Sequence, residues 1–339
     1  MRAILYDTMT DTHGMSYIET RYATCSVGHE PDASASERRS IGKTYINRLV
    51  LFVMGNSPSY VVNAGVGKLA FKAPPCGYTL GQCEMVYTIS AERVATRLFT
   101  PLGNVLCPTK QRWIARRQYD DSRLLFIFSH GNADDLQTSA VYSQWLADTF
   151  DVNVLGYDYK GYGNSEAGMT TKGNMQEAIE AVYNLAVTRM AVPVDRIVLM
   201  GKSLGTGPTV HIASQSPCAV GVILVSPLAS GARTLFDTKN VPRAVMAGLD
   251  QVFMPSVQRM ASIQMPTCII HGTEDTLIGV DNARALEIRC RSQAAYPALY
   301  VRAGHNDIET LHAELFVEHV RAFLQHAERM ALFTQTERD

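Results

Sequence analysis

A short motif, Gly-Lys-Ser-Leu-Gly at residues 201–205, constrains the fold of this 339-residue chain more than any other feature. It follows an apolar run, residues 197–200, and precedes an amphipathic stretch, residues 209–214. A serine in a sharp turn between a strand and a helix is held in a strained backbone conformation, and flanking glycines let neighbouring chain pass without a Cβ clash. The pattern therefore predicts a turn that presents the hydroxyl of Ser203 at the carboxyl end of a sheet.

Two further residues follow Ser203 in an informative order. The motif alone occurs by chance in roughly one chain in ten of this length, so its partners decide its meaning. Asp275 follows the apolar run 268–270 and His305 follows the run 299–301. The order Ser, Asp, His is typical of α/β-hydrolases, and residues after parallel strands meet at one edge of the sheet. Because an imidazole must take the serine proton while a carboxylate fixes its tautomer, we predict a nucleophile, a base and an orienting acid in this set.

An oxyanion hole is expected upstream. The apolar run 124–128 is typical of a buried strand and leads into Ser-His-Gly-Asn-Ala, residues 129–133. In α/β-hydrolases the loop after the third strand supplies one backbone N–H, and the residue after the nucleophile supplies the other. We assign these donors to Asn132 and Leu204, with Ala133 as the alternative to Asn132.

Other polar residues near the predicted strands receive structural interpretations. His130 is expected to hold its loop by hydrogen bonds, and Asp158 to stabilise a turn, since it precedes the nucleophile in the chain. Glu274 is the competitor of Asp275 for the acid. Lys202 is expected to face away from the reacting carbonyl or to meet an anionic part of the substrate, because a buried unpaired ammonium is costly.

Four segments carry a resemblance to a known family. They are Phe-Ser-His-Gly-Asn-Ala (128–133), Tyr-Asp-Tyr-Lys-Gly-Tyr-Gly (157–163), His-Gly-Thr-Glu-Asp (271–275) and Gly-His-Asn-Asp-Ile-Glu (304–309). From about residue 69 to 325 the chain resembles the α/β-hydrolase domain-containing protein family, subgroup seventeen, whose members remove palmitate from cysteines of membrane-bound proteins. The resemblance implies a palmitoyl-protein thioester hydrolase that works through an acyl-serine intermediate on S-acylated, membrane-associated proteins. The alternatives are a lipid or carboxyl esterase, a serine aminopeptidase-like hydrolase, and a pseudoenzyme scaffold.

The chain also departs from that subgroup. Lys202 stands where the subgroup usually has Gln, which puts the substrate preference in question. The N-terminal cysteine cluster of the subgroup, itself a site of acylation, is missing, and Cys25, Cys76, Cys83 and Cys107 are scattered instead. Any membrane attachment is therefore expected to use a different signal.

Composition limits the class of partner. A formal net charge of −1 gives no electrostatic footprint for nucleic acid. The chain has 7 cysteines without a Cys-x-x-Cys pair, which argues against a disulfide framework or a zinc site. We expect no metal and no cofactor. Since no stretch reaches about 18 apolar residues, we expect no transmembrane span.

The N-terminal region holds a candidate lipidation signal. Residues 1–53 are expected to be disordered or a mis-annotated extension, residues 54–82 a lead-in, and residues 83–331 the hydrolase domain. Met-Gly-Asn-Ser-Pro-Ser, residues 54–59, fits the N-myristoylation signal, which acts only when translation begins at its methionine. Gly55 would then carry the lipid and hold the enzyme at the cytoplasmic face of membranes, with the cytosol as the alternative.

The remaining pattern predicts an α/β-hydrolase fold with a mostly parallel eight-stranded sheet and helices on both faces. A short insertion before the acid-bearing strand, residues 226–262, is expected to form a lid or acyl-chain wall, with ordinary core packing under a long loop as the alternative. The strands are expected at residues 84–90, 94–99, 124–128, 152–157, 197–200, 220–225, 267–270 and 298–301, and the helices at residues 139–150, 174–190, 204–214, 281–290 and 308–331.

Overall fold

The chain divides into two compact units, Met1–Ser57 and Pro58–Asp339. The computed structural model describes residues 3–10, 16–23, 71–101, 121–215, 219–231, 233, 250, 254–290 and 295–336. In the first unit, β1 (Ala3–Thr10) and β2 (Ser16–Ala23) form an antiparallel hairpin. The hairpin lies within residues 1–53, for which the sequence predicts a disordered or mis-annotated extension. Its strands are rich in β-branched and aromatic residues, which favour extended backbone. The boundaries predicted for the domains stay predictions.

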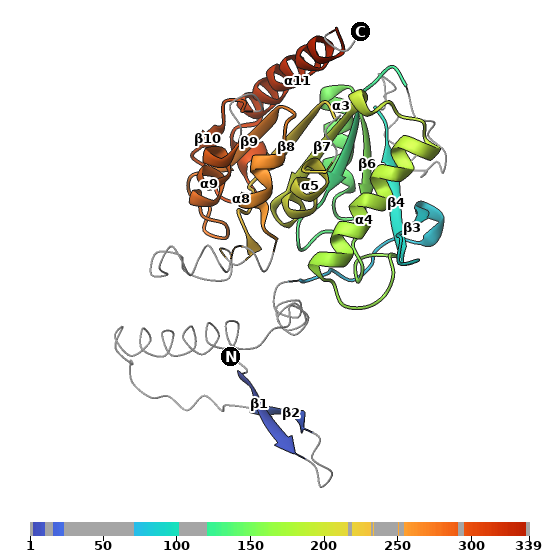
Figure 1. Ribbon diagram of the computed structural model, residues 1–339, viewed down its shortest axis with the longest axis vertical. Coiled ribbons are helices and arrows are strands. Elements are labelled where there is room, and N and C mark those ends of the chain that lie inside the picture. The colour runs from blue at the N-terminus through green and yellow to red at the C-terminus, as the bar shows by residue number, and fades with distance from the viewer. Residues whose placement is uncertain are drawn as a thin grey trace. The chain divides into compact units, whose positions relative to one another are not determined.

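The second unit is built on one eight-stranded sheet with the order β10-β9-β8-β7-β5-β6-β4-β3 (Figure 1). Neighbouring strands from β6 across to β10 pair in parallel, whereas β4 is antiparallel to both β3 and β6. This confirms the predicted α/β-hydrolase fold with its mostly parallel sheet. The strands are β3 (Glu84–Tyr87), β4 (Arg93–Phe99), β5 (Leu125–Ser129), β6 (Asn153–Tyr157), β7 (Ile197–Lys202), β8 (Gly221–Val225), β9 (Thr267–Gly272) and β10 (Leu299–Val301).

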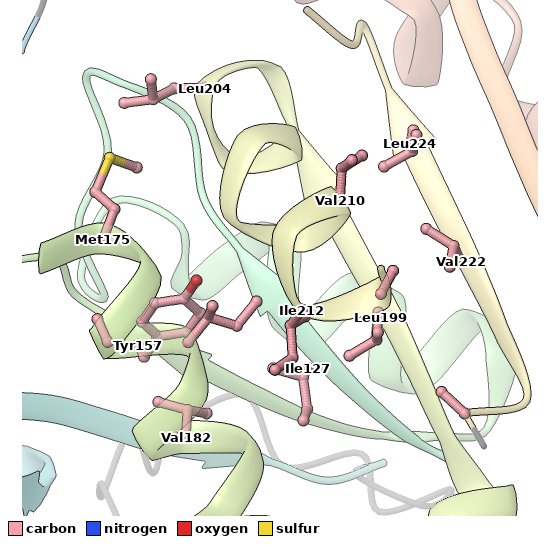
Figure 2. Packing of buried hydrophobic residues seen from close by; sticks show 14 of the residues in the cluster. Ile127, Tyr157, Met175, Val182, Leu199, Leu204, Val210, Ile212, Val222 and Leu224 are labelled. Carbon is pink, nitrogen blue, oxygen red and sulfur yellow. The ribbon is translucent and has the colours of Figure 1, made fainter. Parts of the chain in front are cut away.

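Helices cover both faces of this sheet. Side chains alternate along a strand, so β5 directs Ile127 to one face and Phe126 and Phe128 to the other. The first face packs against α4, α5, α8 and α9, with Ile127, Leu199 and Val210 in its core (Figure 2), and the second packs against α3 and α11. The helices are α3 (Ala140–Phe150), α4 (Lys172–Asn184), α5 (Thr206–Ala213), α8 (Ser256–Arg259), α9 (Asp281–Arg289), α10 (Ile308–Leu311) and α11 (Ala313–Thr336).

The C-terminal helix differs from its predicted form. A single helix was expected over residues 308–331, but His312, with φ −130° and ψ 39°, separates α10 from α11. The imidazole Nε2 of His312 lies 3.1 Å from the backbone oxygen of Arg302 in the loop after β10. This tertiary contact ties α10 to the loop that precedes it.

The insertion expected at residues 226–262 is described in part. It contains α8 and a 3-10 turn, Met260–Ser262, and its apolar Leu235-Phe236 and Val245-Met246 pairs lie outside the described residues. A lid over the site therefore stays a prediction. No helix in the described part of the chain has the length and apolar character needed to cross a membrane.

Candidate active site

Ser203 occupies a strained turn at the carboxyl end of β7. Its φ is +54°, in the left-handed region that non-glycine residues rarely adopt. The 3-10 turn Ser203–Gly205 then leads directly into α5. A Cβ on Gly205 would lie 2.0 Å from the backbone oxygen of Ser129, so only glycine lets the turn pass this close to the end of β5. Local packing thus holds the serine, which is half-buried, in this turn at the end of the strand.

The structure brings Ser203, His305 and Asp275 into one hydrogen-bonded line. His305 Nε2 lies 2.8 Å from Ser203 Oγ, and His305 Nδ1 lies 2.6 Å from Asp275 Oδ2. Ser203 follows β7, Asp275 follows β9 and His305 follows β10. The carboxyl ends of these parallel strands lie along the same edge of the sheet. Because a carboxylate can only accept, Nδ1 carries the imidazole proton and Nε2 is free to accept from the serine hydroxyl.

Asp275 is held rigidly as an anion. Its Oδ1 accepts hydrogen bonds from the backbone N–H groups of Leu277 and Ile278, each at 2.8 Å. The buried His271 approaches Oδ2 at 3.4 Å. Burial by itself would raise the pKa of Asp275, but hydrogen bonds from His271, His305 and the Ile278 N–H outweigh burial and hold this pKa well below its ordinary range. The carboxylate therefore stays charged at neutral pH and fixes the imidazole.

Glu274 does not share this position. Its carboxylate pairs with the guanidinium of Arg302 at 2.6 Å, and both side chains are exposed. Asp275, and not Glu274, is the acid in contact with His305.

The loop after β5 lies beside Ser203, where an oxyanion hole is expected. A Cβ on Gly131 would lie 3.9 Å from the Cβ of Ser203. The side-chain oxygen of Asn132 accepts hydrogen bonds from Tyr162 Oη at 2.7 Å and from the backbone N–H of Lys72 at 3.0 Å. Leu204 is buried next to the nucleophile, and Ala133 is exposed. The loop is thus fixed close to Ser203, and the assignment of its N–H donors to Asn132 or Ala133 stays a prediction.

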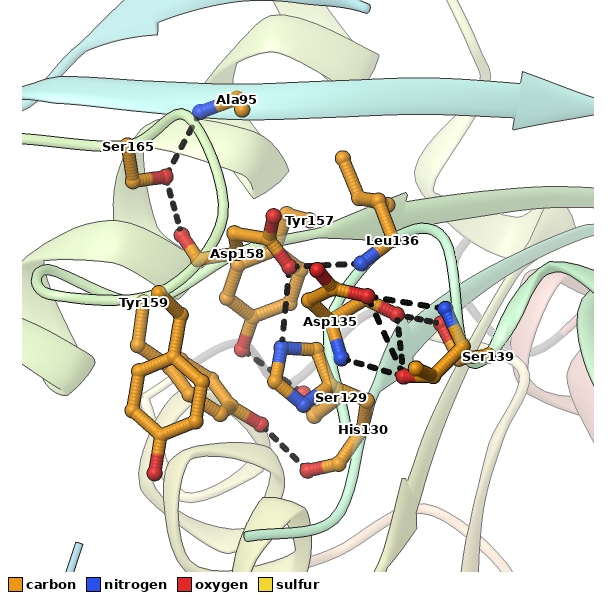
Figure 3. A network of polar contacts seen from close by, with 12 residues as sticks. Ala95, Ser129, His130, Asp135, Leu136, Ser139, Tyr157, Asp158, Tyr159 and Ser165 are labelled. Atoms are coloured by element: carbon orange, nitrogen blue, oxygen red, sulfur yellow. Dashed lines mark hydrogen bonds and ion pairs between the residues drawn. The ribbon is translucent and has the colours of Figure 1, made fainter. Parts of the chain in front are cut away.

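A buried polar network lies behind this loop (Figure 3). His130 Nε2 is 3.2 Å from Asp158 Oδ1, which also accepts from the backbone N–H of Leu136 at 2.8 Å. Asp158 Oδ2 accepts from the hydroxyl of Tyr78. Burial would lower the pKa of His130, but the carboxylate of Asp158 and the backbone oxygen of Gly131 together raise it. These contacts give His130 and Asp158 the structural roles expected of them.

Lys202 has a partner that the sequence did not suggest. Its Nζ lies 2.7 Å from Glu309 Oε1 and 4.9 Å from the ring centroid of Tyr142. The hydroxyl of Tyr142 donates to the same Glu309 oxygen at 2.9 Å. The ammonium is therefore neutralised within the protein instead of meeting an anionic substrate, as we had considered. The available signal was that Glu309 ends the Gly-His-Asn-Asp-Ile-Glu segment.

Two further expectations concern metals and lipids. Among the residues that the structure describes, no group of three or more His, Cys, Asp or Glu side chains could hold a metal ion. Cys76, Cys83, Cys268 and Cys290 are free thiols. Gly55, the candidate for lipidation, lies outside the described residues.

Comparison with known proteins places the chain in a family. It is 38% identical over 205 residues to Alpha/beta hydrolase domain-containing protein 17C of Xenopus laevis, covering 60% of this chain and 62% of that protein. It is 32% identical over 282 residues to Alpha/beta hydrolase domain-containing protein aho-3 of Caenorhabditis elegans, covering 81% of this chain and 80% of that protein. The chain belongs to the α/β hydrolase domain-containing protein 17 family. The match spans less than two thirds of the Xenopus relative's own length.

Two broader comparisons concern a family model and the fold. The family model described as serine aminopeptidase, S33, matches residues 120–258. The esterase Pf2001 of Pyrococcus furiosus shares the fold, with a TM-score of 0.54 and 17% identity over 75% of this chain and 99% of the esterase. Est1E of Butyrivibrio proteoclasticus shares it with a TM-score of 0.53 and 17% identity over 72% of this chain and 99% of Est1E. At such identity, these two structures bear on the fold of this family member and not on its substrate.

Proposed function

We propose that the protein is a serine hydrolase that cleaves S-acyl thioesters of cysteine in membrane-associated proteins, with palmitoyl groups as its main substrate. The observation that carries the proposal is the line from Ser203 Oγ through His305 to Asp275, with contacts of 2.8 Å and 2.6 Å at a serine of φ +54°. Membership of the α/β hydrolase domain-containing protein 17 family supports an S-acyl group as the substrate.

The proposed reaction has two steps. Ser203 Oγ attacks the thioester carbonyl carbon while its proton passes to His305 Nε2. Backbone N–H groups of Leu204 and of the loop at Asn132 stabilise the tetrahedral oxyanion. When the carbon–sulfur bond breaks, His305 returns the proton to the cysteine thiolate. Water then attacks the carbonyl carbon of the acyl-serine while His305 takes a proton from it, the bond from that carbon to Ser203 Oγ breaks, and His305 returns the proton to Oγ as the fatty acid leaves.

Labelling by a fluorophosphonate probe tests the nucleophile. We expect rapid labelling of the native protein at Ser203 and none after Ser203→Ala, because the Ser203 hydroxyl is hydrogen-bonded to an imidazole that is itself paired to a carboxylate. Labelling that survives the substitution, or a native protein that stays unlabelled, would contradict the assignment and favour a pseudoenzyme scaffold.

Matched palmitoyl thioester and oxyester substrates test the reaction class. Faster turnover of the thioester supports the proposal, and preference for the oxyester favours a lipid or carboxyl esterase. The match to the serine aminopeptidase model makes a third substrate worth including, an aminoacyl amide with a free amine. Its turnover in preference to both esters would replace the proposal by an aminopeptidase.

Peripheral attachment to the cytoplasmic face of a membrane, through a myristoyl group on Gly55, belongs to the same proposal. A single myristoyl chain binds membranes only marginally, so a second signal such as acylation of the exposed Cys76 is included. A version of the protein beginning at Met54 is expected to incorporate a myristate analogue and to lose the label after Gly55→Ala. Failure to incorporate it would leave the cytosol as the location.

A further inference from the structure

An ion pair joins the two segments that carry the proposed nucleophile and base. Lys202 is the last residue of β7 and directly precedes Ser203. Glu309 lies in α10, four residues after His305. Lys202 Nζ donates to Glu309 Oε1 at 2.7 Å, a contact across 107 residues of sequence. The pair therefore connects the end of β7 to α10, the helix that begins three residues after His305.

This pair is largely removed from solvent. The side chains of Lys202 and Glu309 are 16% and 11% exposed, so the contact is only weakly screened by water and salt. Glu309 Oε2 is buried and, among the described residues, has no hydrogen-bond partner, which leaves Oε1 to hold the carboxylate. Removal of either charged group would leave the other charge unpaired in a poorly solvated environment.

Tyr142 contacts both members of the Lys202–Glu309 ion pair. Its hydroxyl donates to Glu309 Oε1 at 2.9 Å, and its ring lies 4.9 Å from Lys202 Nζ. Burial, together with the charge of Glu309, raises the pKa of Tyr142 well above its ordinary value, so the hydroxyl stays a donor at any working pH. Helix α3, which carries Tyr142, thus holds the ammonium and the carboxylate in one relative position.

Besides the ion pair, the loop that carries His305 is attached through the backbone oxygen of Ala303, which accepts from the Glu274 N–H at 3.0 Å, and through the contact of His312 with the backbone oxygen of Arg302. The His305 ring contacts Asp275, and the backbone oxygen of His305 accepts from Ser226 Oγ at 3.3 Å, a long hydrogen bond. Proton transfer requires the imidazole to stay within hydrogen-bond reach of the serine, and displacement of a reacting group by about 1 Å can cost roughly a hundredfold in rate. A contact that fixes α10 against β7 fixes this distance.

We propose that Lys202 and Glu309 are positioning residues, whose ion pair holds the His305 loop against the turn of Ser203 so that Nε2 stays in reach of Oγ. The inference rests on the proposed role of Ser203 as nucleophile. Neither side chain touches the substrate in this scheme. Lys202 accordingly contributes to the rate of proton transfer and not to the recognition of an anionic group.

The test compares variants by fluorophosphonate labelling and by steady-state kinetics below the unfolding temperature of each variant. Lys202→Met and Glu309→Gln are each expected to slow labelling and to lower kcat by about tenfold to a hundredfold, with KM unchanged. Lys202→Arg, which keeps the charge and the donor, is expected to retain most of the rate. The double variant is expected to lose no more than the worse single variant, since both break the same contact.

A matched control is available in Lys160, which forms a partly buried ion pair with Glu92, the two side chains being 23% and 22% exposed. Lys160→Met should label at the native rate. Labelling of both single variants at the native rate would overturn the inference, as would a KM that rises for an anionic thioester and not for a neutral one. Glu309→Gln preserves the shape of the side chain while removing its charge, so it reports on the ion pair even if Lys202→Met fails to fold. An unlabelled native protein would refute the proposed nucleophile instead.

Discussion

Replacing Asp275 by a neutral residue should disable the site, because it moves the imidazole proton of His305 from Nδ1 to Nε2. In the native protein, the backbone N–H groups of Leu277 and Ile278 each donate to Oδ1 of Asp275 at 2.8 Å. In Asp275→Asn these two donors still need an acceptor at that position. The amide oxygen must take that position, which leaves the NH₂ group facing His305 Nδ1 in place of Oδ2. Nδ1 then has to accept, so the imidazole proton moves to Nε2 and the ring can no longer take the proton of the serine.

We expect Asp275→Asn to lower kcat by about 10⁴, which corresponds to about 5.4 kcal/mol of lost transition-state stabilisation. The assay is single-turnover hydrolysis of a palmitoyl thioester, with far-ultraviolet circular dichroism to establish that the fold is kept. Glu274→Gln is the matched control. In the described part of the chain the exposed carboxylate of Glu274 pairs with the exposed Arg302, and we expect its loss to change kcat by less than about threefold. Retention of more than a tenth of the native kcat in Asp275→Asn, or a larger loss in Glu274→Gln, would refute the reasoning.

Two further predictions concern stability. Gly205→Ala should lower the free energy of unfolding by about 3 kcal/mol or more, because the new Cβ would lie 2.0 Å from the oxygen of Ser129. Gly81→Ala, with open space around the new carbon, should change it by less than about 0.5 kcal/mol, and equal effects in urea denaturation would contradict the argument. Asp158→Asn should cost about 3–5 kcal/mol at pH 6 because it strands His130. The pKa of His130 is raised in the folded protein, so the stability that its pairing with Asp158 contributes is full below the unfolded pKa of about 6.5 and declines as pH rises through the folded pKa. A difference in unfolding free energy between Asp158→Asn and the native protein that does not change with pH would refute the assignment.

Much of the sheet follows from the sequence because its strands are short apolar runs bounded by turns. The strand predicted at 267–270 appears as Thr267–Gly272, and the one predicted at 298–301 as Leu299–Val301. Parallel strands end at a common edge, which is why Ser203, Asp275 and His305 could be expected to meet.

The remaining features depend on contacts that local patterns do not contain. The break at His312 accompanies a contact with the backbone oxygen of Arg302, which exists only once β10 and α10 are folded together. The partner of Lys202 lies 107 residues away, and the segment that Glu309 ends gives no sign that its carboxylate meets this lysine. The sequence indicated that an unpaired ammonium would be costly there, without saying which side chain would relieve that cost.

The spacing of the site along the chain has a consequence for newly synthesised protein. Translation produces the turn of Ser203 and the acid Asp275 before the segment with His305, which lies at the far edge of the sheet with β10. A ribosome-bound chain that has not yet released β10 holds a serine without a base, and such a serine is no better a nucleophile than any other alcohol. If Ser203 has the proposed role, the site should therefore stay inactive until β10 has docked. Probe labelling in cells would then count finished molecules and leave nascent chains unlabelled.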